Sequence, residues 1–546
     1  MIRNRLISII YRNSRRRISI RYNSTTNNST STELTYATRK QQIQQQSNDV
    51  NYPRIDTIRN KYNDDSIRLR IDQFVNKFNQ YDFTQLPNKR TNEFYIIEGK
   101  ISSIRKSGRA MYFIDLFQDN HKLQIMATNK LMNLTKDDFD NHHHLFKVGD
   151  YISCIGSASI TNAGELTLKL IKPIEMLTPC LRQIPNRLTH KHIINNRRVL
   201  NYLVNSDSKL PIIIKSKLIQ SIRQFFLNHQ FLEVNTPILS GEGTGANATP
   251  FITHSKFAAP SDSTNPPPLQ LRVAPELWLK KLVISGFERI FEIGTNFRNE
   301  GLDSTHNPEF TSCEFYQSFT SLSELMKLTQ DLFSFIYTDL KQQGFNVDHI
   351  QPFTTEFPKY EFIPTLESKT GIPFPREITE SSLIQYHNQL KLPVPGNTNP
   401  IALLDNLSEI YLESISTTIP NTPIFIYNQP EIMSPLAKST TDSQGRPISS
   451  RFELFINGKE FVNAYEEENN PKRQFEKFEL QQNAKNQFHD DEMLLPDWEY
   501  VKAMEYGLPP TGGWGCGIDR LAMLISKVDR IDSVLPFGNL RDVQKQ

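Results

Sequence analysis

The fold is indicated most strongly by one segment near the C-terminus, Gly512-Gly513-Trp514-Gly515-Cys516-Gly517-Ile518-Asp519-Arg520-Leu521-Ala522-Met523-Leu524-Ile525. Its first half predicts a glycine-dense strand whose bare backbone leaves room for a flat ligand. Its second half predicts an apolar helix, and Arg520 falls in the first turn, where a guanidinium group suits a phosphate. The alternative for this segment alone is a tight packing joint between a strand and a helix.

A second stretch, between residues 290 and 319, strengthens the functional interpretation. Two alternating runs, 290–297 and 311–319, predict antiparallel strands. The polar loop between them contains Arg298, Glu300 and His306 and is far longer than a hairpin needs. Long loops in compact domains are usually functional or disordered. A solvated charged loop would explain either segment alone, but both together are hard to attribute to chance.

The two stretches resemble motifs 2 and 3 of class II aminoacyl-tRNA synthetases. Their residues are similar to those of lysyl-tRNA synthetases in particular. The resemblance rests on Phe297–Gly301, His306–Thr311, Cys313–Tyr316, Gly507–Gly515 and Gly517–Leu521, and it extends over most of the chain. It implies an α+β fold: a class II synthetase antiparallel sheet with flanking helices, preceded by an N-terminal five-stranded OB-type β-barrel. The implied activity is that of an ATP-dependent lysine–tRNA ligase.

The composition suits a globular protein of two or three domains, with 546 residues of which 38% are hydrophobic and 22% charged. No apolar run approaches the length of a membrane span, so no membrane partner is expected. The four cysteines (Cys154, Cys180, Cys313 and Cys516) show no CxxC spacing. This spacing argues against a disulfide scaffold and a structural zinc site, and reduced thiols are expected.

The charge is unevenly distributed, because residues 1–22 contain seven arginines and no acidic residue while the whole chain carries only +3. The rest is therefore slightly acidic, and any nucleic-acid surface must be a local patch. Apolar residues at helical spacing (Ile2, Leu6, Ile9, Ile10) complete the pattern of a mitochondrial transit peptide, which is predicted for residues 1–24. The predicted location is the mitochondrial matrix. A basic arm that grips RNA is the alternative.

Three further segments follow the predicted transit peptide along the chain. Residues 25–90 are predicted to be a linker with a short helix near 66–78, and the polar part up to residue 50 is expected to be disordered. Residues 91–182 are predicted to form an anticodon-binding barrel of the OB type, from alternating runs at 95–99, 110–117, 123–127, 151–155 and 166–171. Without the resemblance, an unspecialised five-stranded barrel fits equally well. Residues 196–546 would form the catalytic domain.

Basic and aromatic residues lie side by side in the predicted barrel. Arg105, Lys106 and Arg109 precede the aromatic Phe113, a combination that suits single-stranded RNA because bases stack on rings while cations hold phosphates. An ordinary barrel strand with Phe113 in the core is the alternative. In the family pattern, Phe113 and Gln124, and more loosely Arg105, match positions that read the anticodon. The resemblance therefore implies tRNA(Lys) as a partner.

The implied reaction begins with attack of the lysine carboxylate on the α-phosphate of ATP, and a tRNA ribose hydroxyl then takes the lysyl group. The first step needs aligned anions and stabilised phosphate charge rather than a protein nucleophile. Arg298 is the candidate for gripping the α-phosphate and the attacking carboxylate, and Arg520 for holding the γ-phosphate. By resemblance, Glu300, His306 and Phe310 lie near ATP, with Phe310 stacking on adenine.

A pair of carboxylates offers the hard oxygen ligands that Mg2+ prefers. Asn457-Gly458 is a strong turn signal, and a two-residue turn pairs Phe455 with Glu460 and Glu453 with Val462. Glu453 and Glu460 then become diagonal neighbours on one face, where their charges repel unless a cation bridges them. Solvated carboxylates on an exposed edge are the alternative, whereas the resemblance implies metal-binding glutamates.

A cationic substrate requires buried carboxylate partners, because its ammonium group loses its hydration in the pocket. Glu314 and Tyr316 are two apart on a predicted strand and face the same way. We expect Glu314 and Glu467 to meet the ε-ammonium group, with Tyr316 as a hydroxyl partner. The resemblance places further residues in the amino-acid pocket: Gly245, Glu276, Asn463, Tyr465 and Glu467.

The sequence itself supports two of these pocket positions, Glu276 and Asn463, less directly than the others. Taken locally, Glu276 is equally well explained as a residue that favours a helix start. Strict strand alternation also places Asn463 on the opposite face from Glu460 unless a bulge or bend intervenes.

Three positions depart from the family pattern: Thr244 replaces a glycine, Glu466 a small hydroxyl residue, and Asn470 an acid. Thr244 is expected to narrow the approach to the α-amino group, and Glu466 to add charge near the pocket. The amphipathic run 214–226, followed by a short strand that ends at Pro237, resembles motif 1, which implies a homodimer. Taken alone, the apolar stripe is more simply explained as core.

Three other functions fit parts of the sequence. A class II synthetase for aspartate or asparagine has a similar architecture, but its pocket would need a cation where the matching positions here are acidic. A non-catalytic RNA-binding relative would lack Arg298, Arg520 or the glutamate pair, and all of these are present. A free-standing oligonucleotide-binding protein with a structural C-terminal domain leaves both arginine motifs unexplained.

Overall fold

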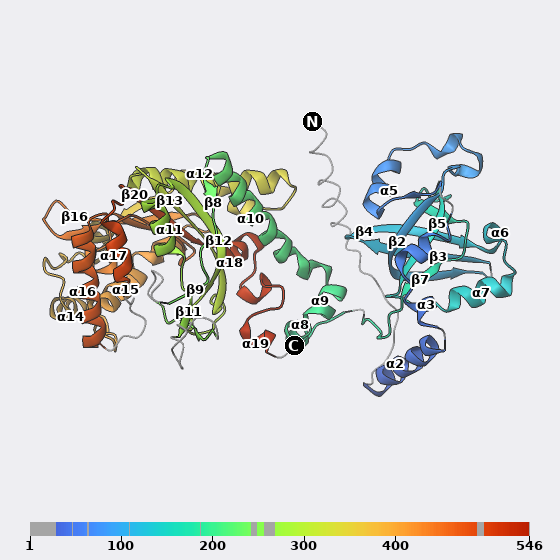
Figure 1. The fold of residues 1–546 in the computed structure, drawn as a ribbon, viewed down its shortest axis with the longest axis horizontal. Coiled ribbons are helices and arrows are strands. Elements are labelled where there is room, and N and C mark those ends of the chain that lie inside the picture. Colours follow the sequence, from blue (N-terminus) through green and yellow to red (C-terminus); the bar gives the residue numbers. More distant parts are fainter. Residues whose placement is uncertain are drawn as a thin grey trace, which may run out of the picture. The chain divides into compact units, whose positions relative to one another are not determined.

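The computed structural model describes residues 29–45, 47–62, 65–108, 110–185, 187–241, 248–255, 268–488 and 496–544. The predicted transit peptide, residues 1–24, lies outside these ranges. The described residues form two compact units, which divide between Leu188 and Thr189. In Figure 1 the smaller unit is coloured from blue to teal and the larger one from green to red.

The smaller unit is built around a closed five-stranded barrel. Strands β2, β3, β4, β6 and β5 pair in that order, and β5 also pairs with β2, which closes the barrel. Their bounds are Tyr95–Ser107 (β2), Met111–Gln118 (β3), His121–Thr128 (β4), Tyr151–Ile160 (β5) and Leu166–Leu170 (β6), while β1 (Ile67–Arg68) and β7 (Glu175–Thr178) extend the sheet. The inward side chains form one apolar core, so the predicted five-stranded barrel is confirmed.

Short helices contribute to the barrel core. Helix α5 (Ile71–Phe78) buries Phe74 and Phe78 there, and α6 (Asn129–Met132) and α7 (Lys136–His144) lie between β4 and β5 along the chain. The helix predicted near residues 66–78 begins only at Ile71, because residues 67 and 68 pair in parallel with β2.

The segment before the barrel is more ordered than its composition predicts. Residues 29–44 form helix α2 (Ser29–Gln44), so the expectation of disorder up to residue 50 is wrong for the described part. Arg39 of this helix donates to Asp150 at 2.8 Å in a buried ion pair. The polar composition that predicts disorder does not reveal a partner 111 positions away.

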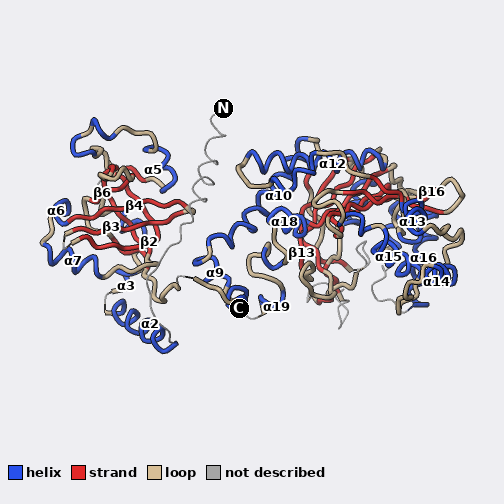
Figure 2. Tube along the Cα trace, turned by 180° about the vertical axis from the view of Figure 1, so that it is seen from behind, coloured by secondary structure: helices blue, strands red, loops and turns tan. Residues whose placement is uncertain are grey.

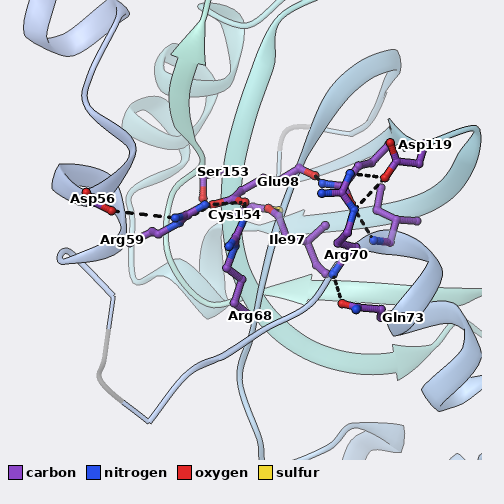
Figure 3. Close-up of polar contacts among 12 residues, drawn as sticks. Asp56, Arg59, Arg68, Arg70, Gln73, Ile97, Glu98, Asp119, Ser153 and Cys154 are labelled. Atoms are coloured by element: carbon purple, nitrogen blue, oxygen red, sulfur yellow. Dashed lines mark hydrogen bonds and ion pairs between the residues drawn. The ribbon is translucent and has the colours of Figure 1, made fainter. Parts of the chain in front are cut away.

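Two arginines outside the barrel meet at Glu98 of β2. Arg59 ends helix α4 (Ile55–Arg59), which follows α3 (Asn48–Asn51), and its Nε lies 2.8 Å from Glu98. Arg68 of β1 approaches the same carboxylate at 3.1 Å, as Figure 3 shows. These ion pairs attach α4 and β1 to the barrel wall.

The larger unit contains an eight-stranded sheet in the order β14–β15–β18–β19–β20–β13–β12–β8. Neighbouring strands from β15 to β12 are antiparallel, and the two edge strands run parallel to their neighbours. The bounds are Leu232–Glu233 (β8), Arg289–Phe297 (β12), Glu309–Ser318 (β13), Lys359–Glu361 (β14), Ile424–Tyr427 (β15), Arg451–Ile456 (β18), Lys459–Glu466 (β19) and Thr511–Gly517 (β20). The predicted strand pair around the polar loop is β12 and β13, and the predicted glycine-dense strand is β20. The antiparallel sheet is therefore confirmed.

One face of this sheet is covered by α10 (Leu210–Asn228), α12 (Leu322–Gln342) and α18 (Ile518–Ser526), which Figure 2 shows beside its strands. Aromatic rings form the centre of the packing. Phe226 of α10 stacks on Phe291 of β12 with 5.0 Å between ring centroids, and Phe315 of β13 stacks on Trp514 of β20 at 5.1 Å. Because side chains alternate along a strand, the residues next to these rings point to the other face.

The other face is partly covered by α11 (Glu276–Ile284), α16 (Pro471–Phe488) and α17 (Trp498–Met504), which share an apolar cluster with β12 and β13. The remaining elements are the helices α8 (Lys191–Asn196), α9 (Arg198–Val204), α13 (Phe362–Thr370), α14 (Glu380–Gln389), α15 (Pro400–Tyr411) and α19 (Leu540–Val543) and the short strands β9 (Leu239–Ser240), β10 (Ile252–Thr253), β11 (Leu269–Leu271), β16 (Ser439–Thr441) and β17 (Pro447–Ser449). None of the described helices is both long and apolar enough to cross a membrane. All four cysteines are free, as expected.

Candidate active site

A cavity of about 530 Å³ lies on the polar face of the large sheet. Its walls come from β12, β13, β18, β19, β20 and α18, together with the loop between β12 and β13. Most residues predicted for the site line it: Glu276, Arg298, Glu300, His306, Phe310, Glu314, Tyr316, Glu453, Glu460, Asn463, Tyr465 and Arg520. Glu467 is buried beside Gly513 of the cavity wall. Gly245 lies outside the described residues.

Arg298 begins the loop after β12. Its guanidinium carbon lies 5.2 Å from the ring centroid of Phe310, at the start of β13 just after the loop. The backbone amide of Arg298 donates to the carbonyl oxygen of Pro308 at 2.8 Å, so the two ends of the loop are held together. A guanidinium group beside an aromatic ring suits a ligand that is both planar and anionic, as a nucleotide is.

Arg520 is attached to the same loop by a chain of polar contacts. Its Nη2 donates to Nε2 of His306 at 2.5 Å, and its Nη1 donates to the carbonyl oxygen of Glu460 at 3.0 Å. Nδ1 of His306 lies 2.7 Å from the carboxylate of Asp303. Because Nε2 accepts from Arg520, the ring proton of His306 belongs on Nδ1, where it points at Asp303.

Asp303 is a residue that the sequence did not single out. Burial alone would raise the pKa of Asp303. Hydrogen bonds from the amides of Thr305 and His306 and from the His306 ring outweigh burial and lower this pKa well below its usual value. The available signal was the spacing Asp-x-Thr-His, which is typical of an Asp that hydrogen-bonds its own backbone two residues on.

The β18–β19 hairpin has the predicted Asn-Gly turn but contains one extra residue. Pairing across the hairpin skips Phe461, so Glu453 pairs with Asn463 and the predicted pairing with Val462 is wrong. The extra residue is a β-bulge, which reverses the direction of the residues that follow it. Glu460 and Asn463 consequently line the same cavity. The bulge that strand alternation required is therefore present.

Glu453 and Glu460 present two carboxylates to this cavity. Arg451 donates to Glu453 at 2.5 Å and to Oδ1 of Asn463 at 2.9 Å. Burial and the charge of Glu453 raise the pKa of Glu460, so negative charge at the pair is only partly compensated. No group of three or more His, Cys, Asp or Glu side chains in the described ranges is arranged to hold a metal ion. The pair would offer a divalent ion the hard oxygen ligands that such ions prefer.

Three glutamates are buried at the cavity: Glu276, Glu314 and Glu467. The hydroxyl of Tyr465 donates to Glu276, and that of Tyr316 lies 3.4 Å from Glu314. Burial raises the pKa of Glu314 to about 8; the charge of Glu276 adds to this effect and a nearby arginine opposes it. An ammonium group in the cavity would restore the ionised carboxylate, so this group of glutamates favours a cationic ligand.

Lys280 of α11 is a buried cation that sequence reasoning missed. Its side chain is fully buried, and its Nζ lies 2.7 Å from Oε1 of Glu276 and contacts Oε2 of Glu467. Glu276 and Glu467 therefore already share one ammonium group. The signal was present in the sequence, because Glu276 and Lys280 are four apart on a predicted helix and so lie on one face.

The described departures from the family pattern lie away from the cavity. Oε1 of Glu466 accepts the backbone amide of Leu322 at 2.7 Å, at the start of α12 on the opposite face of the sheet. The expectation that Glu466 adds charge near the pocket is wrong, because strand alternation turns it away. Asn470 accepts the amide of Lys472 at 3.0 Å and caps α16. Thr244 lies outside the described residues.

Three residues predicted to read the anticodon, Arg105, Phe113 and Gln124, share the outer face of the barrel. Arg109 lies outside the described residues. Arg105 pairs with Phe113 across β2 and β3, and its guanidinium carbon lies 5.9 Å from the Phe113 ring centroid. Phe113 is half-buried and does not belong to the barrel core, so the alternative of a core side chain is wrong. On β4, Gln124 donates to Glu165 at 2.7 Å, and both line a cavity of about 350 Å³. Glu165, on the turn before β6, had no signal in the sequence beyond its acidity.

Family models match both units of the chain. Residues 190–541 match the model described as tRNA synthetases class II (D, K and N), and residues 95–172 match the OB-fold nucleic acid binding domain. The first match covers more than half of the chain.

Relatives of the chain carry one common name. It is 41% identical to the mitochondrial lysine–tRNA ligase of Schizosaccharomyces pombe, over 82% of this chain and 84% of that protein. It is 39% identical to the mitochondrial lysine–tRNA ligase of Saccharomyces cerevisiae, over 82% of each. A lysine–tRNA ligase of Aliarcobacter butzleri is 35% identical over 92% of this chain and 97% of that protein. The chain therefore belongs to the class II tRNA synthetases and, among them, to the lysine–tRNA ligase family.

Proposed function

We propose that this chain activates lysine with ATP to lysyl-adenylate and transfers the lysyl group to the 3′ end of tRNA(Lys) in mitochondrial translation. The observation that carries the proposal is one cavity shared by buried glutamates and two arginines, Arg298 and Arg520. The carboxylates suit a cationic amino acid, and the guanidinium groups suit the phosphates of ATP. The names of the relatives support the same substrates.

Activation of lysine requires two anions to meet, the lysine carboxylate and the α-phosphate. Arg298 would hold both in line, and Arg520 would hold the γ-phosphate with its direction fixed by His306 and the carbonyl of Glu460. Phe310 would stack on adenine, and Glu300 lies in the same cavity wall. No protein nucleophile is needed, because the substrate carboxylate is itself the attacking group.

Lysine would bind along the glutamate side of the cavity. Glu314 and Glu467 would meet the ε-ammonium group, with the hydroxyl of Tyr316 beside them. Buried carboxylates can hold an ammonium group that has lost its hydration, which a neutral pocket could not do. The rest of the amino acid would contact Gly245, Glu276, Asn463 and Tyr465.

The family uses ATP and, in general, divalent metal ions. We infer that the ion here is Mg2+ and that Glu453 and Glu460 hold it. When bound, the ion neutralises phosphate charge in the activation step. Arg451 keeps Glu453 in place by a 2.5 Å hydrogen bond.

Transfer to tRNA would use both parts of the chain. Residues 91–182 would bind the anticodon through Arg105, Phe113 and Gln124, and residues 196–546 would carry out the chemistry. The match to an OB-fold nucleic acid binding domain supports RNA as the ligand of the barrel. Aromatic and basic groups on one face fit unstacked bases and their phosphates.

Two further features complete the proposal. Relatives with mitochondrial names support a mitochondrial location, and the arginine-rich residues 1–24 would direct the protein to the matrix. A fusion of the first ~40 residues to a fluorescent protein tests the targeting, and cytosolic fluorescence would refute it.

A homodimer would form through the motif 1 region, where Leu227, Leu232 and Leu239 are exposed.

The activity is tested by ATP–pyrophosphate exchange with each of the twenty amino acids in turn. Lysine alone should stimulate exchange by protein that lacks the predicted transit peptide. A ligase for aspartate or asparagine is the main alternative, but Glu276, Glu314 and Glu467 would repel a substrate carboxylate. A catalytically inactive RNA-binding relative would show no exchange. Stimulation by aspartate or asparagine in place of lysine would refute the substrate assignment.

A further inference from the structure

Lys280 places a fixed ammonium group among the carboxylates of the amino-acid pocket. It follows Glu276 by one helical turn, and its side chain is fully buried. Besides its contacts to Glu276 and Glu467, its Nζ lies 5.3 Å and 5.9 Å from the ring centroids of Tyr465 and Tyr500. Burial alone would lower the pKa of Lys280, but the two carboxylates raise it above its ordinary value, so the group stays charged.

The contacts of Lys280 leave part of the glutamate group unsatisfied. Glu314 has no ion-pair partner in the part of the chain that the structure describes. Oε1 of Glu467, a residue only 1% exposed, accepts no hydrogen bond from the described residues. That oxygen lies against Gly513, where an added Cβ would approach it to 2.0 Å, and Gly513 lines the cavity. Acceptors for a further cation therefore remain next to the cavity.

The balance of charges matches the proposed substrate. When all three glutamates are ionised, they and the one resident ammonium group leave two negative charges. Lysine carries two ammonium groups, and lysyl-adenylate keeps both after the carboxylate has reacted. Buried charges are stable only when they are compensated nearby, so this count favours a ligand with two cationic groups.

We propose that Lys280 is a specificity-determining positioning residue that pairs with Glu276 and Glu467, compensates one of their negative charges, and sets the pocket charge to match lysine. The inference rests on the proposed lysine–tRNA ligase function. Without Lys280, three carboxylates would face two ammonium groups, and the excess carboxylate would take up a proton near neutral pH.

The groups that titrate near Lys280 can be identified from the elements packed around it. They are Glu276 on α11, Glu314 and Tyr316 on β13, Tyr465 and Glu467 at the end of β19, and Tyr500 on α17. Burial raises the pKa values of the three tyrosines above their ordinary value, so their hydroxyls stay protonated. Glu314 and Glu467, whose pKa values are raised by burial, are therefore the groups that respond to pH in this cluster.

The test is the KM for lysine in ATP–pyrophosphate exchange by the full chain between about pH 7 and pH 9. Lys280→Met keeps the length of the side chain and removes its charge. It should raise the KM for lysine at least about tenfold at the lower pH, and the defect should shrink as pH rises, because each pKa unit corresponds to about tenfold. The KM for ATP should change less than about twofold. A loss of packing alone would raise the KM for lysine equally at every pH.

The matched control is Lys281→Met on the next residue of the same helix. Its side chain is 26% exposed, and its ammonium group pairs with Asp497 at 2.7 Å, outside the glutamate cluster. This variant should keep a wild-type KM for lysine throughout the pH range. A folded Lys280→Met protein with a wild-type KM at every pH, or with a pH-independent loss, would overturn the inference.

A double variant keeps the test decisive if Lys280→Met does not fold. Lys280→Met with Glu276→Gln removes both members of the ion pair and again leaves two negative charges, whereas Glu276→Gln alone leaves one. The double variant should bind lysine at least as well as Glu276→Gln. A KM for lysine more than about threefold worse than that of Glu276→Gln would refute the charge match. A wild-type chain without lysine-dependent exchange would instead refute the proposed function.

Discussion

Glu460 and Asn463 face the same cavity although they stand three positions apart on one strand. A regular strand would turn them to opposite faces, and the bulged Phe461 between them restores a common direction. Phe461 is only 5% exposed and belongs to the core on the helix-covered face, which holds the bulge in place. The bulge thus brings a candidate metal ligand and a candidate substrate ligand to one wall.

Glu460→Gln should weaken the use of Mg2+ with ATP. The variant removes one of two carboxylates and keeps the shape of the side chain, so we expect a roughly 10- to 100-fold higher Mg2+ requirement. Exchange rates measured across a MgCl2 titration check this. Glu466→Gln is the control on the same strand, because its side chain points to the other face. Equal Mg2+ requirements in the two variants would count against Glu460 as a ligand.

Glu466→Ser should affect stability rather than substrate binding. The carboxylate of Glu466 accepts the amide of Leu322 in the first turn of α12, where a negative charge is favoured. Its loss should lower the free energy of unfolding by about 0.5–1 kcal/mol, measured by urea denaturation. The KM for lysine should stay unchanged. A raised KM for lysine without a loss of stability would contradict this role.

Glu314→Gln should remove a pH dependence of lysine binding. In the wild-type protein, burial raises the pKa of Glu314 to about 8, and lysine needs the ionised form. The KM for lysine should therefore fall as pH rises toward 8, by up to about tenfold per pH unit. The variant should show a higher KM for lysine that no longer improves over this range. Exchange assays at a series of pH values decide between these outcomes.

The same pKa shift has the opposite effect on the stability of the substrate-free protein. The folded carboxyl group of Glu314 holds a proton that the unfolded chain releases near its ordinary pKa of 4.5. Stability from this group is therefore lost as pH rises from that value through about 8. Glu314→Gln should show a smaller decline in the free energy of unfolding over this interval.

Gly513→Ala should disturb Glu467. A Cβ at this position would lie 2.0 Å from Oε1 of Glu467 and 2.7 Å from Cε1 of Tyr316, so the carboxylate must move. Overpacking of this kind costs about 1–3 kcal/mol of unfolding free energy, and the KM for lysine should rise as well. Gly515→Ala is the matched variant for stability, since its Cβ would meet its nearest neighbour at 3.6 Å. Equal stability of the two variants would contradict the prediction.

The parts of the fold that follow from local pattern could be predicted from the sequence. Alternation of apolar residues gave β12, β13 and the barrel strands, because each strand buries one face. The direction of Glu314 and Tyr316 followed from the same rule. Alternation counted from Asn463 and Tyr465 turns Glu466 away from the pocket, whereas alternation counted from Glu460 does not, because the bulge at Phe461 lies between them.

Other features depend on contacts between distant residues and had no local pattern. The attachment of Arg39 to Asp150 gives order to a polar helix whose composition alone indicates disorder. The position of the bulge at Phe461 is set by packing on the opposite face, and the ion pair between Lys280 and Glu467 joins a helix to a strand end far along the chain. Pattern reasoning could only say that such a bulge was required.

Phe113→Ala should separate the two proposed steps. The ring lies on the outer face of the barrel beside Arg105, in a different compact unit from the catalytic cavity. Stacking of one base on an aromatic ring contributes about 1–3 kcal/mol, so charging of tRNA(Lys) should weaken roughly 5- to 150-fold in KM for tRNA. Lysine-dependent exchange needs no tRNA and should be unchanged. Phe113→Tyr keeps a ring and should retain most of the charging activity, whereas an equal loss of exchange and charging in Phe113→Ala would argue against a separate anticodon-binding surface.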